Sequence, residues 1–246
     1  MIIKAFLFDI NGTLIDINTD ESNEEIYRGI SHILTYQGIS MHRWEVRDEY
    51  YRIMETQRKA SREKYPEFDV VELFREFIRR RVSAPGIIPP EKLKWLPVFL
   101  AEAYRGISRN RLQLYPGVLD ILNDLRPRYK LAAISDAQSA WCLPEMHAVG
   151  IDGYFDAIIV SGDFGYRKPD SRLFTAAMTA LETVPENILF VGNDMYRDVY
   201  GAQQQGIKTV FFSSNQGSKQ AEGVEPDYII YQFSEMKQAV EFFERQ

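Results

Sequence analysis

Cysteine and long apolar runs are scarce in this sequence of 246 residues. The single Cys142 has no partner for a disulfide within the chain, and the first residues lack the charged and then apolar pattern of a secretory signal. No apolar run approaches the roughly 18 residues that a membrane-spanning helix needs. We therefore expect a cytoplasmic protein that does not enter a membrane.

Histidines are also few, and the 29 basic residues are outnumbered by 35 acidic ones. The formal net charge is −6, whereas proteins that bind nucleic acids usually carry a basic face, so nucleic acid is not an expected partner. His32, His42 and His147 lie in expected helices without the spacing of metal ligands. Apolar residues, in contrast, make up 45% of the chain, which is enough for a substantial core.

Hydrophobic periodicity divides the chain into two kinds of segment. Residues 22–108 contain four helical patterns, each bounded by glycine, proline or a capping residue: 23–38, 42–65, 69–82 and 91–107. From Leu114 onward, short β-rich runs alternate with helical patterns. This alternation predicts an α/β fold, a Rossmann-like and mostly parallel sheet covered by helices on both faces.

The run IKAFLFD at residues 3–9 predicts a strand that lies before the helical block. A lone strand cannot satisfy its own backbone, so this strand must join the sheet that the later residues form. The helical block is then an insertion. We expect a core domain of residues 1–15 and 114–246, and a helical cap domain of residues 16–113.

Polar residues follow four of the expected strands, at the edge of an open α/β sheet where ligands bind. They are Asp9 after the first strand, Ser135 at the end of LAAIS with Asp136 next to it, Lys168 after AIIVS, and Asp194 and Asp198 after ILFVGN. Taken singly, each has an ordinary explanation as a turn, a helix cap or an exposed charge. Their common position beyond strand ends favours a single site.

At these residues the chain resembles the haloacid dehalogenase-like (HAD) hydrolase superfamily. Its first motif is similar to FDINGTL at residues 8–14, its second to Ser135, its third to RKPD at 167–170, and its fourth to VGNDMYRDVYGA at 191–202. The run YPGV at residues 115–118 is also typical, and the helical insertion resembles the α-helical C1 cap of the family.

The resemblance implies a phosphoryl-transfer site with Asp9 as the nucleophile, which forms an aspartyl phosphate. Ser135 is expected to donate to a phosphoryl oxygen, and Lys168 to bridge Asp9 and the phosphoryl group. A carboxylate attacks phosphorus poorly unless fixed cations neutralise the phosphoryl oxygens, which agrees with this assignment. The expected phosphate-binding residues are Asn11, Gly12, Ser135, Asp136 and Lys168.

The resemblance also implies a bound Mg²⁺, a cation that takes oxygen ligands. The expected metal-site residues are Asp9, Asn11 through its main-chain carbonyl, Asp194 and Asp198, the last of which is expected to orient Lys168 or a metal-bound water. An exposed Lys168 would contribute little to folding. The helical cap is expected to close over the substrate about hinges at residues 14–20 and 110–116.

Asn11 departs from the family's phosphatases, which have a second aspartate two residues after the nucleophile. That aspartate protonates the leaving oxygen and then activates water. An amide exchanges no proton near neutral pH, so a factor of about 10²–10⁴ from general acid–base catalysis should be missing here. The carbonyl that binds the metal survives, because it belongs to the backbone. The sequence predicts an intact phosphate site with weakened turnover.

Three functions remain open from the sequence. The first is a phosphatase of modest activity that acts on a small phosphorylated metabolite, as a monomer or homodimer. The second is hydrolysis of a carbon–halogen or carbon–phosphorus bond; the retained Asp194 and Asp198 argue against a dehalogenase, which needs no metal, and no cap lysine lies in an obviously apolar setting for a phosphonatase imine. The third is a binding or regulatory protein with a catalytically damaged site.

Overall fold

A computed structural model describes residues 1–81 and 88–245, and its centre is a six-stranded sheet. All the strands run parallel, in the order β5-β4-β1-β6-β7-β8. Their bounds are β1 Ala5–Phe8, β4 Lys130–Ser135, β5 Ala157–Val160, β6 Ile188–Gly192, β7 Lys208–Phe212 and β8 Tyr228–Ile230. The α/β, Rossmann-like fold expected from the sequence is confirmed.

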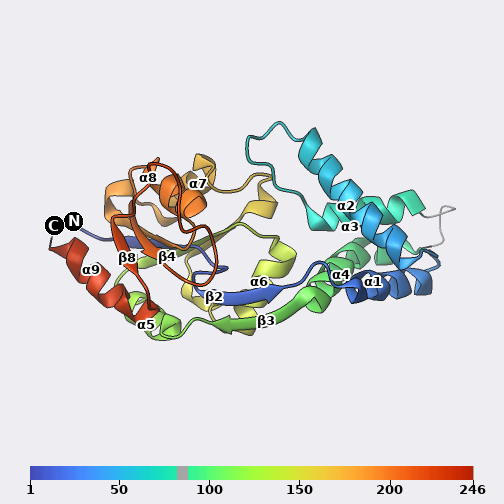
Figure 1. Cartoon of the computed structure of the whole chain (residues 1–246), viewed down its shortest axis with the longest axis horizontal. Coiled ribbons are helices and arrows are strands. Elements are labelled where there is room, and N and C mark those ends of the chain that lie inside the picture. The colour runs from blue at the N-terminus through green and yellow to red at the C-terminus, as the bar shows by residue number, and fades with distance from the viewer. Residues whose placement is uncertain (82–87, 246) are drawn as a thin grey trace.

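Helices cover both faces of this sheet (Figure 1). They are α5 Val118–Leu125, α6 Ser139–Ala148, α7 Ser171–Leu181, α8 Gly201–Gln203, α9 Met236–Glu244, the π-helix η4 Met195–Tyr200, and the short 3₁₀ turns η1 Asp152–Tyr154, η2 Ser161–Asp163, η3 Pro185–Asn187 and η5 Phe233–Glu235. The two chain ends meet on one side, where the Met1 ammonium donates to the Phe243 carbonyl at 2.6 Å.

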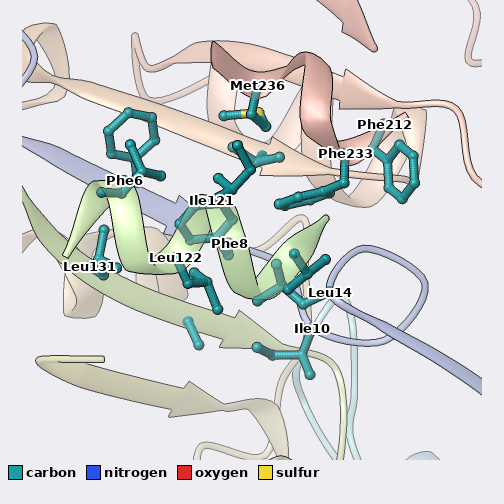
Figure 2. Packing of buried hydrophobic residues seen from close by; sticks show 14 of the residues in the cluster. Phe6, Phe8, Ile10, Leu14, Ile121, Leu122, Leu131, Phe212, Phe233 and Met236 are labelled. Carbon is teal, nitrogen blue, oxygen red and sulfur yellow. The ribbon is translucent and has the colours of Figure 1, made fainter. Parts of the chain in front are cut away.

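Strand β1 is apolar throughout because both of its faces are buried. Phe6 and Phe8 point to one face, where they join a cluster with α5, η5 and α9 (Figure 2). Ala5 and Leu7 point to the other face, which α7 covers. Successive side chains of a strand alternate between faces, so a continuous apolar run is what a central strand needs.

The helical segment forms a second hydrophobic cluster beside the sheet (Figure 1). Its helices are α1 Glu24–Tyr36, α2 Arg43–Ala60, α3 Val70–Arg81 and α4 Pro90–Ser108, so the four helical patterns of the sequence correspond to four helices. Local signals set their starts: Asn23 accepts from Glu25 N at α1, and Pro90 opens α4. In the described part of the chain, no helix is long and apolar enough to cross a membrane.

A two-stranded antiparallel ribbon, β2 Ile15–Thr19 with β3 Arg109–Leu114, connects the helical segment to the sheet. The sequence did not predict these strands and assigned the same residues to hinges. The expected domain boundaries fall inside the ribbon, where Ile15 pairs with Leu114. Ile17 packs into the cluster on the sheet. We retain residues 1–15 with 114–246, and 16–113, as the proposed division into domains, with the ribbon as their junction.

Candidate active site

Three neighbouring strands deliver the central residues of the site. Strand β1 lies between β4 and β6, and Phe8 is level with Ala133 and Val191. Asp9 follows β1, Ser135 ends β4, and Asp194 lies two residues beyond β6. The chain therefore brings these three expected site residues to the same edge of the sheet, because the carboxyl ends of parallel strands coincide.

Lys168 lies at the centre of the site and is only 2% exposed. Its Nζ donates to Asp9 Oδ1 at 2.6 Å, to Asp198 Oδ1 at 2.7 Å and to the Ile134 carbonyl at 3.1 Å. Burial disfavours the charged ammonium, but the carboxylates of Asp198 and Asp9 outweigh burial and raise the pKa of Lys168. The expectation of an exposed lysine was wrong, whereas its predicted proximity to Asp9 is what the structure shows.

Asp198 is buried and accepts hydrogen bonds both from Lys168 and from the backbone that follows β6. Its Oδ2 accepts hydrogen bonds from the backbone N–H groups of Asn193 and Asp194, each at 3.0 Å. Burial raises its pKa to about 6, although the Lys168 ammonium acts in the opposite direction. A Cβ at Gly192 would lie 2.5 Å from the Asp198 carboxylate, so glycine is required there. Asp198 therefore positions Lys168 through Oδ1 and the start of the loop after β6 through Oδ2.

The turn after β1 fixes the other side of Asp9. The amides of Thr13 and Leu14 donate to the Ile10 carbonyl at 3.2 and 2.9 Å, and Gly12 has a φ of +91°. A Cβ at Gly12 would lie 2.2 Å from Asn193 Nδ2. The turn directs Thr13 Oγ1 to donate to Asp9 Oδ2 at 2.9 Å. Asp9 is therefore held at both oxygens, one by Lys168 and one by Thr13.

Ser135 and Asp136 contribute polar atoms without hydrogen-bond partners. Ser135 is completely buried, and among the described residues its Oγ makes no hydrogen bond. Asp136 Oδ1 accepts from Lys168 N at 2.9 Å, but Oδ2 makes no hydrogen bond within the described part of the chain. Burial raises the pKa of Asp136. Buried polar atoms are almost always paired, so the Ser135 hydroxyl is suited to donate to an incoming ligand. Asp136 Oδ2 instead faces the Arg197 guanidinium, whose Nη1 is 3.6 Å away.

Asp194 caps the start of η4 as well as facing the site. Its Oδ1 accepts from Tyr196 N at 3.1 Å and Arg197 N at 2.8 Å, and its Oδ2 from Ser218 N and Arg197 Nη2, both at 3.0 Å. Burial opposes its charge, but the backbone N–H groups of Arg197 and Ser218 and the Arg197 guanidinium lower its pKa. Arg197 was not singled out from the sequence, although its position three residues after Asp194 on a helical pattern could have indicated the pair.

Asn193 is a second residue of the site that was not singled out from the sequence. Its side chain packs beside Gly12 and Gly217, and its Oδ1 accepts from Thr13 Oγ1 at 3.2 Å. It therefore joins the turn after β1 to the loop after β7. Asn193 is the first polar residue beyond β6, which is the same strand-end signal that identified Asp9.

The oxygen donors of Asp9, Asp194 and the Asn11 carbonyl fit Mg²⁺, which prefers hard oxygen ligands. The site also has an excess of negative charge: four aspartates, at positions 9, 136, 194 and 198, surround Lys168 and Arg197. A divalent cation would balance this excess. Within residues 1–81 and 88–245, no cluster of three or more His, Cys, Asp or Glu could hold a metal. The ligands expected for Mg²⁺ comprise only two such side chains, together with a main-chain carbonyl.

Residues 63–68 of the helical segment contact the loops around the site. Glu67 N donates to the Gly165 carbonyl, and Arg167 N to the Tyr65 carbonyl, each at 3.0 Å. The hydroxyls of Tyr65 and Tyr196 are 2.9 Å apart. These contacts link the helical segment to η4 and to the loop that carries Lys168.

A family model described as haloacid dehalogenase-like hydrolase matches residues 6–212. The match covers most of the chain and includes every strand-end residue described above. The protein belongs to this family of hydrolases, as its sequence motifs indicated.

Several curated phosphatases are similar to the chain. Glyceraldehyde 3-phosphate phosphatase of Pyrococcus abyssi is 27% identical over 211 residues, which cover 85% of this chain and 81% of that protein. Phosphoserine phosphatase of Thermus thermophilus is 31% identical over 139 residues, covering 56% of this chain and 54% of that protein. The similarity to the first of these extends over both the sheet and the helical segment.

Solved structures with the same fold include a 2-haloacid dehalogenase of Pseudomonas syringae, with a TM-score of 0.71, 19% identity, and coverage of 98% of this chain and 100% of that chain. A HAD phosphatase of Thermococcus onnurineus has a TM-score of 0.61 and 24% identity, with coverage of 97% and 98%. At these identities the likeness establishes the fold. The fold is shared by dehalogenases and phosphatases, so the chemistry must be argued from the site.

Proposed function

We propose that the protein is a Mg²⁺-dependent, cytoplasmic phosphatase that acts on a small phosphorylated metabolite through an aspartyl phosphate on Asp9. The observation that carries this proposal is the buried Lys168, whose Nζ contacts Asp9 at 2.6 Å and Asp198 at 2.7 Å. A fixed cation beside a carboxylate nucleophile is what attack on an anionic phosphoryl group requires. The phosphatase names of the relatives support the same assignment.

The residues of the chain have separate roles in this reaction. Thr13 and Lys168 hold the two oxygens of Asp9, so the carboxylate meets phosphorus in a fixed orientation. Ser135 Oγ, buried without a hydrogen bond to any described residue, is available to donate to a phosphoryl oxygen. Asp198 positions Lys168. Bound Mg²⁺, held by Asp9, the Asn11 carbonyl and Asp194, would supply further neutralisation of phosphoryl charge.

Asn11 limits the turnover that this site can reach. Its amide cannot protonate a leaving alkoxide or activate water, so the steps that need proton transfer depend on water or another group. A second function follows from the same residue: a binding or regulatory protein that holds a phosphorylated ligand without efficient hydrolysis. Hydrolysis of a carbon–halogen bond is disfavoured, because Asp194 and Asp198 are both present in the site.

Phosphate release from a panel of small phosphate esters, measured with Mg²⁺ and with chelator, tests the proposal. We expect Mg²⁺-dependent release that Asp9→Asn abolishes, while Asp48→Asn, a change at an exposed aspartate in α2, leaves it unchanged. Retained vanadate binding without phosphate release would favour the binding function. Metal-independent chloride release from 2-haloacids would instead make the protein a dehalogenase.

A further inference from the structure

Arg197 faces two buried carboxylates of the site, Asp194 and Asp136. Its Nη2 is 3.0 Å from Asp194 Oδ2, and its Nη1 is 3.6 Å from Asp136 Oδ2. The carboxylate side chains are only 8% and 7% exposed, whereas that of the arginine is 41% exposed. The guanidinium therefore lies at the surface of the site, over two anions that are buried beneath it.

The two carboxylate oxygens that face Arg197 differ in their other hydrogen-bond partners. Asp136 Oδ2 has no hydrogen-bond partner among the described residues, so Arg197 is the cation that faces it there. Asp194 Oδ2 is shared between Arg197 and the backbone N–H of Ser218. The other oxygen of Asp194 is occupied in capping η4. Oδ2 is thus the oxygen of Asp194 that a metal ion would have to reach, and Arg197 contacts it.

We infer that Arg197 is an internal counter-cation that competes with Mg²⁺ for Asp194 and, when Mg²⁺ displaces it, turns its guanidinium toward the phosphoryl group. The inference rests on the proposed metal and phosphate site. Two cations cannot share one carboxylate oxygen at contact distance without mutual repulsion. Asp136 directly follows Ser135, the proposed phosphate donor. A guanidinium that leaves Asp194 but stays paired with Asp136 therefore remains near the proposed phosphate position. Arginine is well suited to this exchange because its planar fork binds carboxylate and phosphate alike.

Isothermal titration with Mg²⁺ alone separates this role from a purely structural one. We expect Arg197→Gln to bind Mg²⁺ about tenfold more tightly than the wild type, because the variant removes the competing positive charge. Arg197→Lys, which keeps the charge but cannot span both carboxylates, should show a smaller gain. Arg126→Gln is the matched control, since Arg126 forms an exposed pair with Asp156. Its affinity for Mg²⁺ should equal that of the wild type.

A second titration, with inorganic phosphate at saturating Mg²⁺, tests the other half of the exchange. Arg197→Gln should bind phosphate about tenfold more weakly, while Arg126→Gln is unaffected. Tighter metal binding together with weaker phosphate binding is not expected from a general loss of structure, and thermal melts of both Arg197 variants establish that they fold.

Each contrary result has a distinct meaning. Unchanged or weaker Mg²⁺ binding in Arg197→Gln, with binding lost in Asp194→Asn, would overturn the inference and leave the metal site in place. Unchanged phosphate binding in Arg197→Gln would overturn the inference that Arg197 turns from Asp194 to the phosphoryl group. If the wild type binds no Mg²⁺, the proposed metal site fails, and the inference fails with it.

Discussion

Two amide side chains belong to the segments around Asp9, those of Asn11 and Asn193. Asn11 lies two positions after Asp9, and Asn193 accepts from Thr13, whose hydroxyl also contacts Asp9. Neither amide can give or take a proton near neutral pH. At the scale of single residues, therefore, the site contains the proposed nucleophile Asp9, the cation Lys168 and the proposed phosphate donor Ser135, but an amide rather than an acid two positions after Asp9.

Restoring that acid is the first prediction. Asn11→Asp should raise hydrolysis of an alkyl phosphate by about 10²–10⁴-fold, because an alkoxide needs a proton to leave. Hydrolysis of p-nitrophenyl phosphate should rise much less, since nitrophenolate leaves readily without one. Steady-state rates on the two esters measure this difference, and mass spectrometry should first exclude deamidation at Asn11-Gly12.

Asn193→Asp is the matched control for this experiment. It makes the same amide-to-carboxylate change at a different position of the site, where the side chain contacts Thr13 and not Asp9. A leaving-group-dependent gain in Asn11→Asp alone would identify proton transfer as the missing function. No gain on any ester in Asn11→Asp, with Mg²⁺ binding retained, would favour the binding or regulatory function.

The second prediction concerns the stability that Lys168 provides. Lys168→Met would leave Asp9 and Asp198 buried without their cation, and breaking a buried ion pair in this way costs about 3–5 kcal/mol of unfolding free energy. The double variant Lys168→Met with Asp198→Asn should recover part of that loss. Urea unfolding of both variants measures it. A loss below about 1 kcal/mol would mean that the lysine behaves like an exposed one.

At the scale of elements, the start of α6 is joined to the start of α3 by one buried glutamine. Gln138 Oε1 accepts from Val70 N at 2.9 Å, and its Nε2 donates to the Phe68 carbonyl at 2.6 Å. Helix α3 packs in the helical cluster, whereas α6 contributes to that cluster and to the cluster on the sheet. Gln138 satisfies backbone groups of the helical segment that would otherwise be unpaired. These two hydrogen bonds anchor the end of residues 63–68, the segment of the helical insertion that contacts the loops around the site.

The third prediction follows from this contact. Gln138→Ala should lower the unfolding free energy by about 2–3 kcal/mol, because it removes two hydrogen bonds and leaves both backbone partners unsatisfied. Limited proteolysis should become faster within residues 61–69. Ser139→Ala removes an exposed bond to Asp163 and is the control for a neighbouring polar deletion. Equal effects of the two substitutions would show that Gln138 does not anchor this segment.

At the scale of the whole molecule, the helical cluster is connected to the sheet domain through Trp141. This residue belongs to α6 but packs in the helical cluster, stacks on Tyr104 at 6.0 Å, and donates from Nε1 to the Ala101 carbonyl at 2.8 Å. Four residues further along α6, Glu145 is 2% exposed and pairs with Arg105 of α4 and with Arg109 at the start of β3. Helix α6 therefore couples the helical segment to the sheet.

The fourth prediction tests that coupling. Calorimetry of the wild type should show one unfolding transition, whereas Trp141→Ala should destabilise the helical cluster by about 3–5 kcal/mol and resolve two transitions. Trp95 is 46% exposed, so Trp95→Ala is the matched control and should keep a single transition. Two transitions in the wild type would show that the clusters unfold independently.

Much of the secondary structure was predictable because its causes are local. The four helices of the insertion follow from apolar periodicity, capping residues and prolines within each segment. Strand β1 follows from an apolar run that ends at Asp9, and the alternation after Leu114 indicated the parallel sheet. The order of polar residues at strand ends likewise located Asp9, Ser135, Lys168 and Asp194.

The sequence by itself determined the four helices of the insertion, the strands of the parallel sheet and the family motifs at their ends, since each of these depends on neighbouring residues. Only the tertiary structure decided the ribbon of β2 and β3, the burial of Lys168 and the contacts of Arg197. Asp16 and Arg111 of the ribbon are 95 positions apart, and Lys168 and Asp9 are 159 apart. No local pattern encodes such a contact, because its energy depends on which groups folding brings together and removes from water.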